Sequence, residues 1–212
     1  MSSKNKNMKL KICGMKYAAN IQDVAKLRPD YMGFIFYSRS KRFAGRTLQA
    51  SIVKALPSSI KRVGVFVNSP FAHVLRIVRK FGLDLVQLHG NESPEYCERI
   101  SKYVPVIKAF GVDEDFDFTS IESYSKFCKF FLFDTKTKTY GGSGKTFNWK
   151  VLQRHTGATP YFLSGGIGVE EIGKIKEATW NKKPMAIDVN SRVEVRPGMK
   201  NGNMLQRLKS EI

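Results

Sequence analysis

Eight short apolar runs recur along the chain, each separated from the next by a stretch long enough for a helix. They are Leu10–Ile12, Tyr31–Phe36, Val63–Val67, Leu85–Leu88, Val104–Ala109, Phe130–Phe133, Tyr161–Leu163 and Met185–Val189. The runs are apolar almost throughout instead of alternating with polar residues, which is typical of strands buried on both faces and therefore of a parallel sheet. Their centres lie roughly 20 to 30 residues apart, which leaves room for a strand, a helix and two short loops in each repeat.

This pattern predicts an α/β protein built as a single (β/α)8 TIM barrel. Eight β-α units in 212 residues favour a closed barrel over an open doubly wound sheet, and the loops must be short because such barrels usually need about 250 residues. Ser93 followed by Pro94 predicts the start of one helix. We expect the catalytic barrel to span residues 8–212 and residues 1–7, rich in Ser, Asn and Lys, to form a disordered extension, with Met8 as an alternative start.

Membrane and secretion signals are absent from the sequence. There is no run of about 18 apolar residues that could span a bilayer, so no membrane partner is expected. The charged N-terminal segment lacks the apolar core of a secretory signal. The three cysteines are odd in number and widely spaced, which argues against a disulfide framework and against a metal site. A reduced, cytoplasmic location fits these features best.

The net charge is +18, with 36 Lys and Arg against 18 Asp and Glu. A basic protein that binds nucleic acid is one explanation, since clustered cations release counterions from phosphates. The cations are scattered, however, and no arginine-glycine run or basic-zipper pattern accompanies them. We therefore predict no nucleic-acid partner and a surplus charge that is spread over the surface.

Two residues at strand ends could carry acid-base chemistry, because active residues of such barrels lie where strands end and βα loops begin. Cys13 follows the first run. A thiol works as a base only with a cationic neighbour or a helix terminus beside it, and the alternative is a buried structural cysteine. Asp134 follows the sixth run, where an acid is poor core material. Its alternative is a helix cap or a loop ion pair.

Other strand ends offer binding groups. Gly165 and Gly166, ahead of a helix expected to begin near Val169, supply free amides for an anion such as phosphate, or form an ordinary tight turn. Arg42 could clamp a second anionic group or be one more surface cation. His89, which follows the fourth run, is predicted to bind the substrate.

The loop from Thr135 to Thr146 is long for a βα connection, where about 2–6 residues are usual, and it contains three glycines. We predict that it is a mobile lid which closes over the substrate and excludes water. A static loop is the alternative.

Several segments at these strand ends match one enzyme family in order and spacing. They are LysIleCysGly (11–14), GlyPheIlePheTyr (33–37), SerLysArg (40–42), ValGlyValPheValAsn (63–68), ValGlnLeuHisGly (86–90), PheAspThrLysThr (133–137), TyrGlyGlySerGlyLysThrPheAsnTrp (140–149), LeuSerGlyGlyIle (163–167), AspValAsnSerArgValGlu (188–194) and ProGly (197–198). Together they resemble phosphoribosylanthranilate isomerase, an enzyme of tryptophan biosynthesis, through most of the chain.

The resemblance implies an Amadori rearrangement of N-(5-phosphoribosyl)anthranilate to a 1-deoxyribulose phosphate. Asp134 would protonate the furanose oxygen as general acid, and Cys13 would remove the proton from sugar C2 as general base. The resemblance further implies that Arg42 holds the anthranilate carboxylate and that Asp188 faces the sugar hydroxyls. The phosphate would bind to Gly165, Gly166, Asn190 and Ser191. No cofactor or metal is expected; the substrate is a small molecule and the enzyme a monomer or homodimer.

Three positions depart from the family pattern. Arg192 stands where the family usually has glycine, and either costs about 1–2 kcal/mol if a positive φ is needed there or adds a contact to phosphate. Asn190 replaces a serine. Asn201 stands where an acid is common, near the start of the last helix.

Two other functions compete with this one. The histidine-pathway aminoaldose isomerase shares the barrel and the chemistry, but it uses an aspartate in place of Cys13 and needs a second phosphate site. A non-catalytic basic protein that binds RNA or DNA would explain the net charge, but it would leave Cys13, Asp134 and the Gly165–Gly166 loop without a role.

Overall fold

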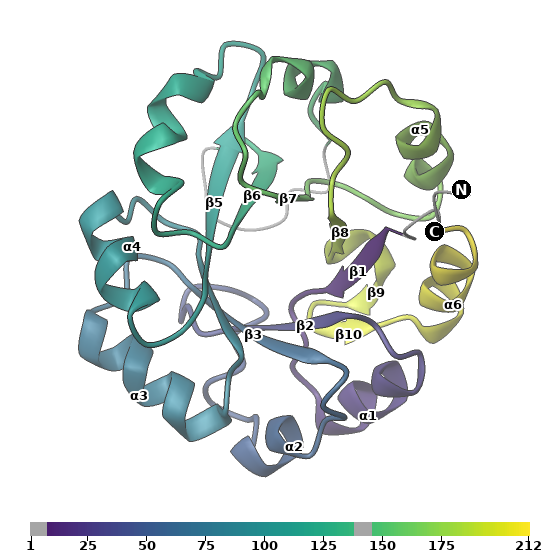
Figure 1. Ribbon diagram of the computed structural model, residues 1–212. Coiled ribbons are helices and arrows are strands. Elements are labelled where there is room, and N and C mark those ends of the chain that lie inside the picture. Colours follow the sequence, from purple (N-terminus) through teal and green to yellow (C-terminus); the bar gives the residue numbers. More distant parts are fainter. Residues whose placement is uncertain (1–7, 138–145) are drawn as a thin grey trace, which may run out of the picture.

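The computed structural model describes residues 8–137 and 146–212, and within them the eight apolar runs form a closed parallel barrel. Its strands follow one another in chain order, and the last pairs with the first (Figure 1). The strands are β1 (Lys9–Ile12), β2 (Tyr31–Ile35), β3 (Lys61–Phe66), β4 (Leu85–Leu88), β5 (Val106–Val112), β6 (Phe130–Thr135), β7 (Tyr161–Leu163) and β8 (Ala186–Val189). The predicted (β/α)8 architecture is confirmed.

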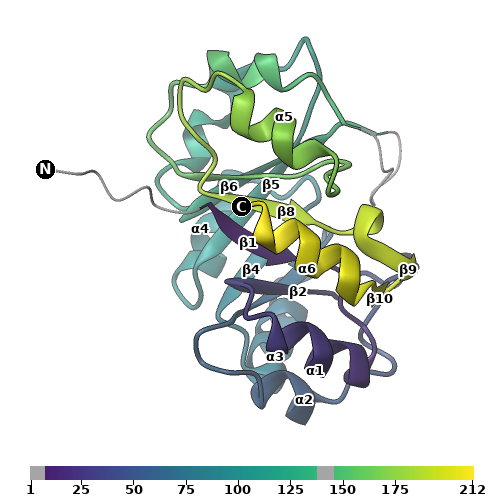
Figure 2. The same cartoon turned by 90° about the vertical axis from the view of Figure 1, so that its right-hand side faces the viewer.

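Helices surround the barrel (Figures 1 and 2). The α-helices are α1 (Ala18–Lys26), α2 (Ala50–Lys54), α3 (Phe71–Phe81), α4 (Pro94–Ser101), α5 (Glu171–Glu177) and α6 (Gly202–Ser210). The connections after β5 and β6 contain 3-10 helices, Phe118–Tyr124 and Trp149–Arg154, instead of the expected α-helices. Residues such as Thr, Ser and Asn favour caps and turns over helix interiors, because their side chains bond to the nearby backbone. Asp117 and Asn148 do so here by capping these two turns.

Two further short strands follow β8. A third 3-10 helix, Ser191–Val193, leads into β9 (Glu194–Arg196), which pairs antiparallel with β10 (Met199–Lys200). This hairpin lies at one end of the barrel, beside α6 (Figure 2). It was not predicted, because two strands of two or three residues are too short to show a hydrophobic period.

The strand boundaries differ slightly from the expected ones. The fifth strand begins at Val106 instead of Val104, since Pro105 has no N–H to donate to a neighbouring strand. The sixth strand continues to Thr135 through pairing with β5, so that Asp134 is part of the strand and does not follow it. The helix start at Ser93 is as predicted: its hydroxyl accepts a hydrogen bond from the amide of Tyr96.

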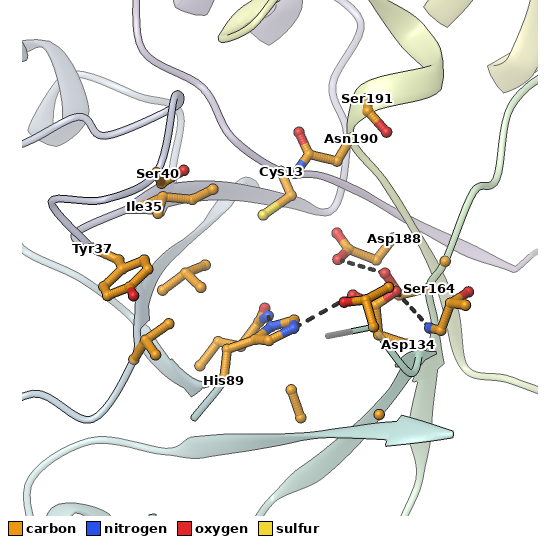
Figure 3. Close-up of a pocket in the computed structure, with 18 of the residues that line it drawn as sticks. Cys13, Ile35, Tyr37, Ser40, His89, Asp134, Ser164, Asp188, Asn190 and Ser191 are labelled. Atoms are coloured by element: carbon orange, nitrogen blue, oxygen red, sulfur yellow. Dashed lines mark hydrogen bonds and ion pairs between the residues drawn. The ribbon is translucent and has the colours of Figure 1, made fainter. Parts of the chain in front are cut away.

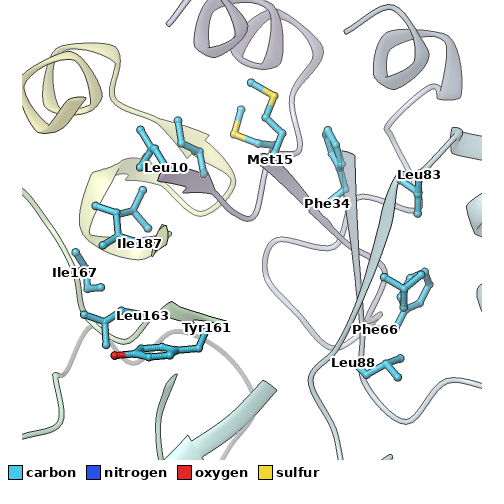
Figure 4. Close-up of a cluster of buried hydrophobic side chains, with 14 of the residues drawn as sticks. Leu10, Met15, Phe34, Phe66, Leu83, Leu88, Tyr161, Leu163, Ile167 and Ile187 are labelled. Carbon is cyan, nitrogen blue, oxygen red and sulfur yellow. The ribbon is translucent and has the colours of Figure 1, made fainter. Parts of the chain in front are cut away.

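Each strand points alternate side chains to the inside and the outside of the barrel. The outward side chains pack with the helices in the larger core; they include Leu10, Phe34, Phe66, Leu88, Leu163 and Ile187 (Figure 4). A smaller cluster fills the barrel below the ends of its strands with the inward side chains Tyr31, Val63, Leu85, Ile107, Phe130, Leu132, Phe162 and Ala186. The interior at that level is therefore solid, and any cavity must lie further along the strands.

None of the described helices is long and apolar enough to cross a membrane. The predicted extension at residues 1–7 lies outside the described residues. So does the central part of the predicted lid, residues 138–145.

Candidate active site

A cavity of about 380 Å³ opens where the strands end. The residues that line its wall follow the inward core residues by two or more positions along the chain, in steps of two, so they also point to the inside of the barrel. This is why residues from all eight strand ends meet in one place. The inward residues that line it are Cys13, Ile35, Tyr37, Val65, Val67, Gln87, His89, Ala109, Gly111, Asp134, Ser164, Asp188 and Asn190 (Figure 3). All the predicted site residues except Arg42 line this cavity, including Gly165, Gly166 and Ser191.

Cys13 lies at the end of β1 with its sulfur directed into the cavity (Figure 3). The residue is only 4% exposed. Burial raises the pKa of its thiol above the ordinary value, and Asp188 adds to this increase. The positive charges of Lys11 and Lys200 oppose the increase without cancelling it. The cationic neighbours that a thiol base needs are therefore present.

Lys11 is fully buried inside the barrel, two residues before Cys13 on the same face of β1. Its ammonium lies 2.8 Å from Oδ1 of Asp188, the residue beside it in the β1–β8 register. Burial alone would lower the pKa of Lys11, but the adjacent Asp188 charge and Cys13 outweigh burial and raise it. Lys11 therefore keeps its charge. The other carboxylate oxygen of Asp188 lies 3.4 Å from the hydroxyl of Ser164, which also faces the cavity.

Asp134 faces the same cavity from β6. Its Oδ1 accepts a hydrogen bond of 2.8 Å from the amide of Thr135, which leaves Oδ2 pointing to His89. The distance from this oxygen to Nε2 of His89 is 3.4 Å (Figure 3). The other ring nitrogen of His89, Nδ1, lies 2.7 Å from Nε2 of Gln87. A carboxyl group, an imidazole and an amide thus form one connected chain.

The loop after β7 has the backbone expected of an anion site. Gly165 and Gly166 have φ angles of +94° and +61°, a conformation that costs glycine little and other residues much more. A Cβ at Gly165 would collide with the Thr135 side chain and backbone. Asn190 and Ser191 line the same cavity from the end of β8 (Figure 3).

The helix after this loop, α5, begins at Glu171, close to the expected start near Val169. A turn leads into it, in which the amides of Glu171 and Ile172 donate to the carbonyls of Gly168 and Val169. The Glu171 carboxylate accepts a hydrogen bond of 2.8 Å from the amide of Gly168, which stabilises this turn. This carboxylate occupies the helix start, so the amides of the glycine loop are the groups left for an anion.

Arg192 carries no backbone strain. Among the described residues only Arg28 and Asn68 have a positive φ without being glycine, so the cost that a positive φ would bring does not arise here. Arg192 lines the cavity, and its guanidinium lies 3.7 Å from both Glu170 and Glu171. Its side chain lies beside Gly168, two residues after Gly166.

Arg42 lies beside the cavity but is held by a partner of its own. Its Nε and Nη2 form a bidentate pair with Glu194 at 2.8 to 3.0 Å. Lys200 also binds Glu194, at 2.7 Å, and the side chain of Asn190, at 2.8 Å. Burial raises the pKa of Glu194, but Arg42 and Lys200 outweigh burial and lower it. Arg42 is therefore oriented by β9, not free at the surface.

Sequence reasoning missed the functional neighbours Lys11, Gln87, Glu194 and Lys200. Lys11 and Gln87 lie within apolar runs, where a polar residue two positions before Cys13 or His89, and so on the same face of the strand, is a usable signal. Glu194 and Lys200 give no such signal, because their contacts depend on the β9–β10 hairpin.

A (β/α)8 barrel with a thiol, two carboxyl groups and a glycine loop around one cavity defines an enzyme of the acid-base class that acts on a small anionic substrate. Comparison with known proteins identifies which one. Residues 10–210 match the family model for N-(5'phosphoribosyl)anthranilate (PRA) isomerase. The chain therefore belongs to the N-(5'-phosphoribosyl)anthranilate isomerase family and is an isomerase of tryptophan biosynthesis.

Individual relatives agree with this assignment. The chain is 40% identical to the N-(5'-phosphoribosyl)anthranilate isomerase of Parabacteroides distasonis, over 97% of this chain and 93% of that one. A crystal structure of the Thermotoga maritima enzyme superposes with a TM-score of 0.85 at 34% identity, covering 96% and 98% of the two chains. A second structure, of such an isomerase in complex with reduced 1-(o-carboxyphenylamino)-1-deoxyribulose 5-phosphate, has a TM-score of 0.79 at 30% identity and covers 96% and 97% of the two chains. These findings favour the isomerase over the histidine-pathway and nucleic-acid-binding hypotheses.

Proposed function

We propose that the protein rearranges N-(5-phospho-β-D-ribosyl)anthranilate to 1-(2-carboxyphenylamino)-1-deoxy-D-ribulose 5-phosphate, with Asp134 as general acid and Cys13 as general base. The observation that carries this proposal is that both residues face one cavity from different strands, β6 and β1 (Figure 3). An acid and a base on separate walls can act on different atoms of one substrate.

Asp134 acts first. It donates its proton to the furanose ring oxygen, the bond from that oxygen to C1 breaks, and the nitrogen lone pair of the substrate forms the protonated Schiff base. The substrate nitrogen is therefore the electron sink, and the steps call for no cofactor. The hydrogen bond from the Thr135 amide stabilises the carboxylate that Asp134 becomes.

Cys13 acts second, as a thiolate. It removes the proton from C2, and the electrons of that C–H bond form the C1–C2 double bond of an enolamine, which tautomerises to the ketone. Lys11 and Lys200 favour the thiolate through their charge, against the effect of burial. The Lys11–Asp188 pair also keeps Asp188 in place to face the sugar hydroxyls.

The two anionic ends of the substrate bind to different sets of residues. The phosphate binds to the amides of Gly165 and Gly166 and to Asn190 and Ser191, all of which line the cavity. Arg42, held in orientation by Glu194, binds the anthranilate carboxylate with the part of its guanidinium that Glu194 leaves free. His89 contacts the substrate beside Asp134.

A cytoplasmic location suits a reaction whose base is a free thiol, since reducing conditions keep it reduced. We extend the expectation of a monomer or homodimer to this chain because a Thermotoga maritima relative is described as dimeric, with monomers generated from it. Light scattering of the purified protein measures the oligomeric state.

Single substitutions test the two roles. Cys13→Ala and Asp134→Asn are each expected to lower kcat by at least about 100-fold, because general acid-base catalysis contributes that much. The assay follows the loss of substrate fluorescence, and circular dichroism checks the fold. Near-normal turnover in either variant would remove that residue from the mechanism.

Matched controls exist in the chain. Cys97 is a buried thiol on α4 that does not line the cavity, and Asp23 is an exposed carboxylate paired with Lys26. Cys97→Ala and Asp23→Asn should leave kcat unchanged.

A further inference from the structure

The chain of polar groups behind Asp134 includes one residue to which the proposed mechanism gives no task. Gln87 points into the barrel from β4, is 1% exposed and lines the cavity. Its Nε2 lies 2.7 Å from Nδ1 of His89, and Nε2 of His89 lies 3.4 Å from Oδ2 of Asp134. Its Oε1 is buried and has no hydrogen-bond partner among the described residues.

A neutral imidazole has one N–H and one acceptor nitrogen, so the contacts that the two ring nitrogens of His89 make are coupled. When Asp134 is ionised, its Oδ2 favours a His89 ring that carries its proton on Nε2, and Nδ1 then accepts from Gln87 Nε2. When Asp134 carries its proton, the carboxyl O–H donates to Nε2. The ring proton then sits on Nδ1 and requires an acceptor.

An amide can meet both requirements. Turned by 180° about its last bond, the Gln87 side chain presents Oε1 to Nδ1 in place of Nε2, with the same shape and in the same space. Gln87 Oε1, which has no hydrogen-bond partner among the described residues, would accept the Nδ1–H of His89 after this rotation. No other uncharged side chain of this size both donates and accepts in this way.

We propose that Gln87 is a positioning residue that sets the tautomer of His89, so that the imidazole matches Asp134 both before and after it gives up its proton. The proposal rests on the role of Asp134 as general acid. It assigns Gln87 no contact with the reacting atoms.

Other ionisable groups lie at or near this cavity. Cys13, Asp188, Lys136 and Arg192 line it, and Lys11 pairs with Asp188 inside the barrel. Glu92 and Lys108 form a buried pair that does not line the cavity. All of them remain in place when Gln87 alone is changed, so a difference between Gln87 variants reports on the amide.

The tautomer can be read directly, without turnover. The sequence has three histidines, and in protein labelled with 15N histidine the ring nitrogen shifts distinguish Nδ1–H from Nε2–H. His73 and His155 lie outside the cavity and serve as internal controls; a His89→Asn variant assigns the remaining signal. With Asp134 ionised, we expect Nε2–H in the native protein, a mixture of tautomers in Gln87→Leu, and Nδ1–H or the doubly protonated ring in Gln87→Glu.

Kinetics provides the second readout. Gln87→Leu should lower kcat by about tenfold or more while KM changes by less than about threefold, since binding groups are untouched. In Gln87→Glu the added negative charge favours the protonated forms of His89 and Asp134. The pH at which activity falls on the alkaline side should therefore rise relative to the native enzyme. A loss of packing would lower kcat without moving that pH.

An unchanged His89 tautomer in both Gln87 variants would overturn the proposal. So would a pH profile of Gln87→Glu that coincides with the native one. If instead Asp134→Asn stayed active while the tautomer followed Gln87, the acid assignment would fail and the coupling of Gln87 to His89 would stand. The two failures are thus distinguishable.

Discussion

Cys13 illustrates how far a single residue can be understood from its neighbours. The sequence predicts a thiol at a strand end, and a thiol that acts as a base needs a cation nearby. The sequence alone does not identify that cation. In the structure this cation is Lys11, which is buried on the same face of the same strand. Lys11 lies inside an apolar run, which assigns it to a strand, but a pattern of burial on both faces gives no separate signal for a buried charge.

The charge of Lys11 should control the ionisation of Cys13. Burial raises the pKa of the Cys13 thiol and Lys11 lowers it, so Lys11→Met should move thiolate formation to higher pH. Activity that depends on the thiolate rises with pH through the thiol pKa, and its acidic side should shift in the same direction. The measurement is the ultraviolet absorbance of the thiolate against pH, taken as the difference between each protein and its Cys13→Ala counterpart.

Lys11→Met also leaves Asp188 buried without its partner, which costs about 3–5 kcal/mol of stability. The double variant Lys11→Met with Asp188→Asn removes both charges and serves as the control. Its thiol should ionise at a pH between those of the single variant and the native protein, because Asp188 opposes Lys11 at Cys13. Lys26→Met, an exposed cation, should change nothing. A thiolate curve that does not move in Lys11→Met would show that Lys11 acts only in packing.

The strands were predictable because each is an apolar run buried on both faces. Side chains along each strand alternate between the inside and the outside of the barrel, and this alternation determines which residues can line the cavity. Once the strand ends are known, the inward residues Cys13, His89, Asp134 and Asp188 follow from the two-residue period. The two 3-10 connections and the β9–β10 hairpin were not predictable. They are too short for periodicity, and their geometry is set by contacts such as Glu194 with Arg42.

The last helix shows why a departure from the family pattern can be neutral. Asn201 precedes α6, and its Oδ1 accepts a hydrogen bond of 3.1 Å from the amide of Met204. Asn and Asp are both good N-caps, so Asn201 caps the helix as the usual acid would. Asn201→Ala should lower the free energy of unfolding by about 1 kcal/mol. Asn201→Asp should match or exceed the native stability, since a negative charge suits this end of a helix.

Urea unfolding of the three proteins measures these differences. Asn203→Ala, an exposed change on the same helix without a capping bond, is the matched control and should lose no stability. Equal stability of Asn201→Ala and the native protein would mean that the cap contributes nothing to holding α6.

The net charge of +18 is a property of the whole molecule, because the charged residues that produce it are not confined to one site. The buried cations Lys11, Lys108 and Lys200 each have a carboxylate partner. The surplus must therefore come from the remaining cations, and we keep the prediction that these are spread over the surface with a local concentration near the anion sites. A salt-dependent titration with duplex DNA or RNA tests it; tight binding at physiological salt would contradict it.

A surplus of one sign repels itself more in the compact state than in the unfolded chain. Salt should relieve this repulsion, so the protein should become more stable as NaCl rises from about 0.02 M to about 0.3 M, where the screening length falls from roughly 20 Å to roughly 6 Å. If screening recovers about 1 kcal/mol, Tm rises by about 2–4 °C in a chain of this size. Buried pairs such as Lys11–Asp188 are shielded from the added ions and should contribute little to the change. Calorimetry across the salt series measures the effect, and an uncharged osmolyte at equal osmolality controls for exclusion from the surface. A Tm that falls with salt would show that attractive surface ion pairs outweigh the surplus charge.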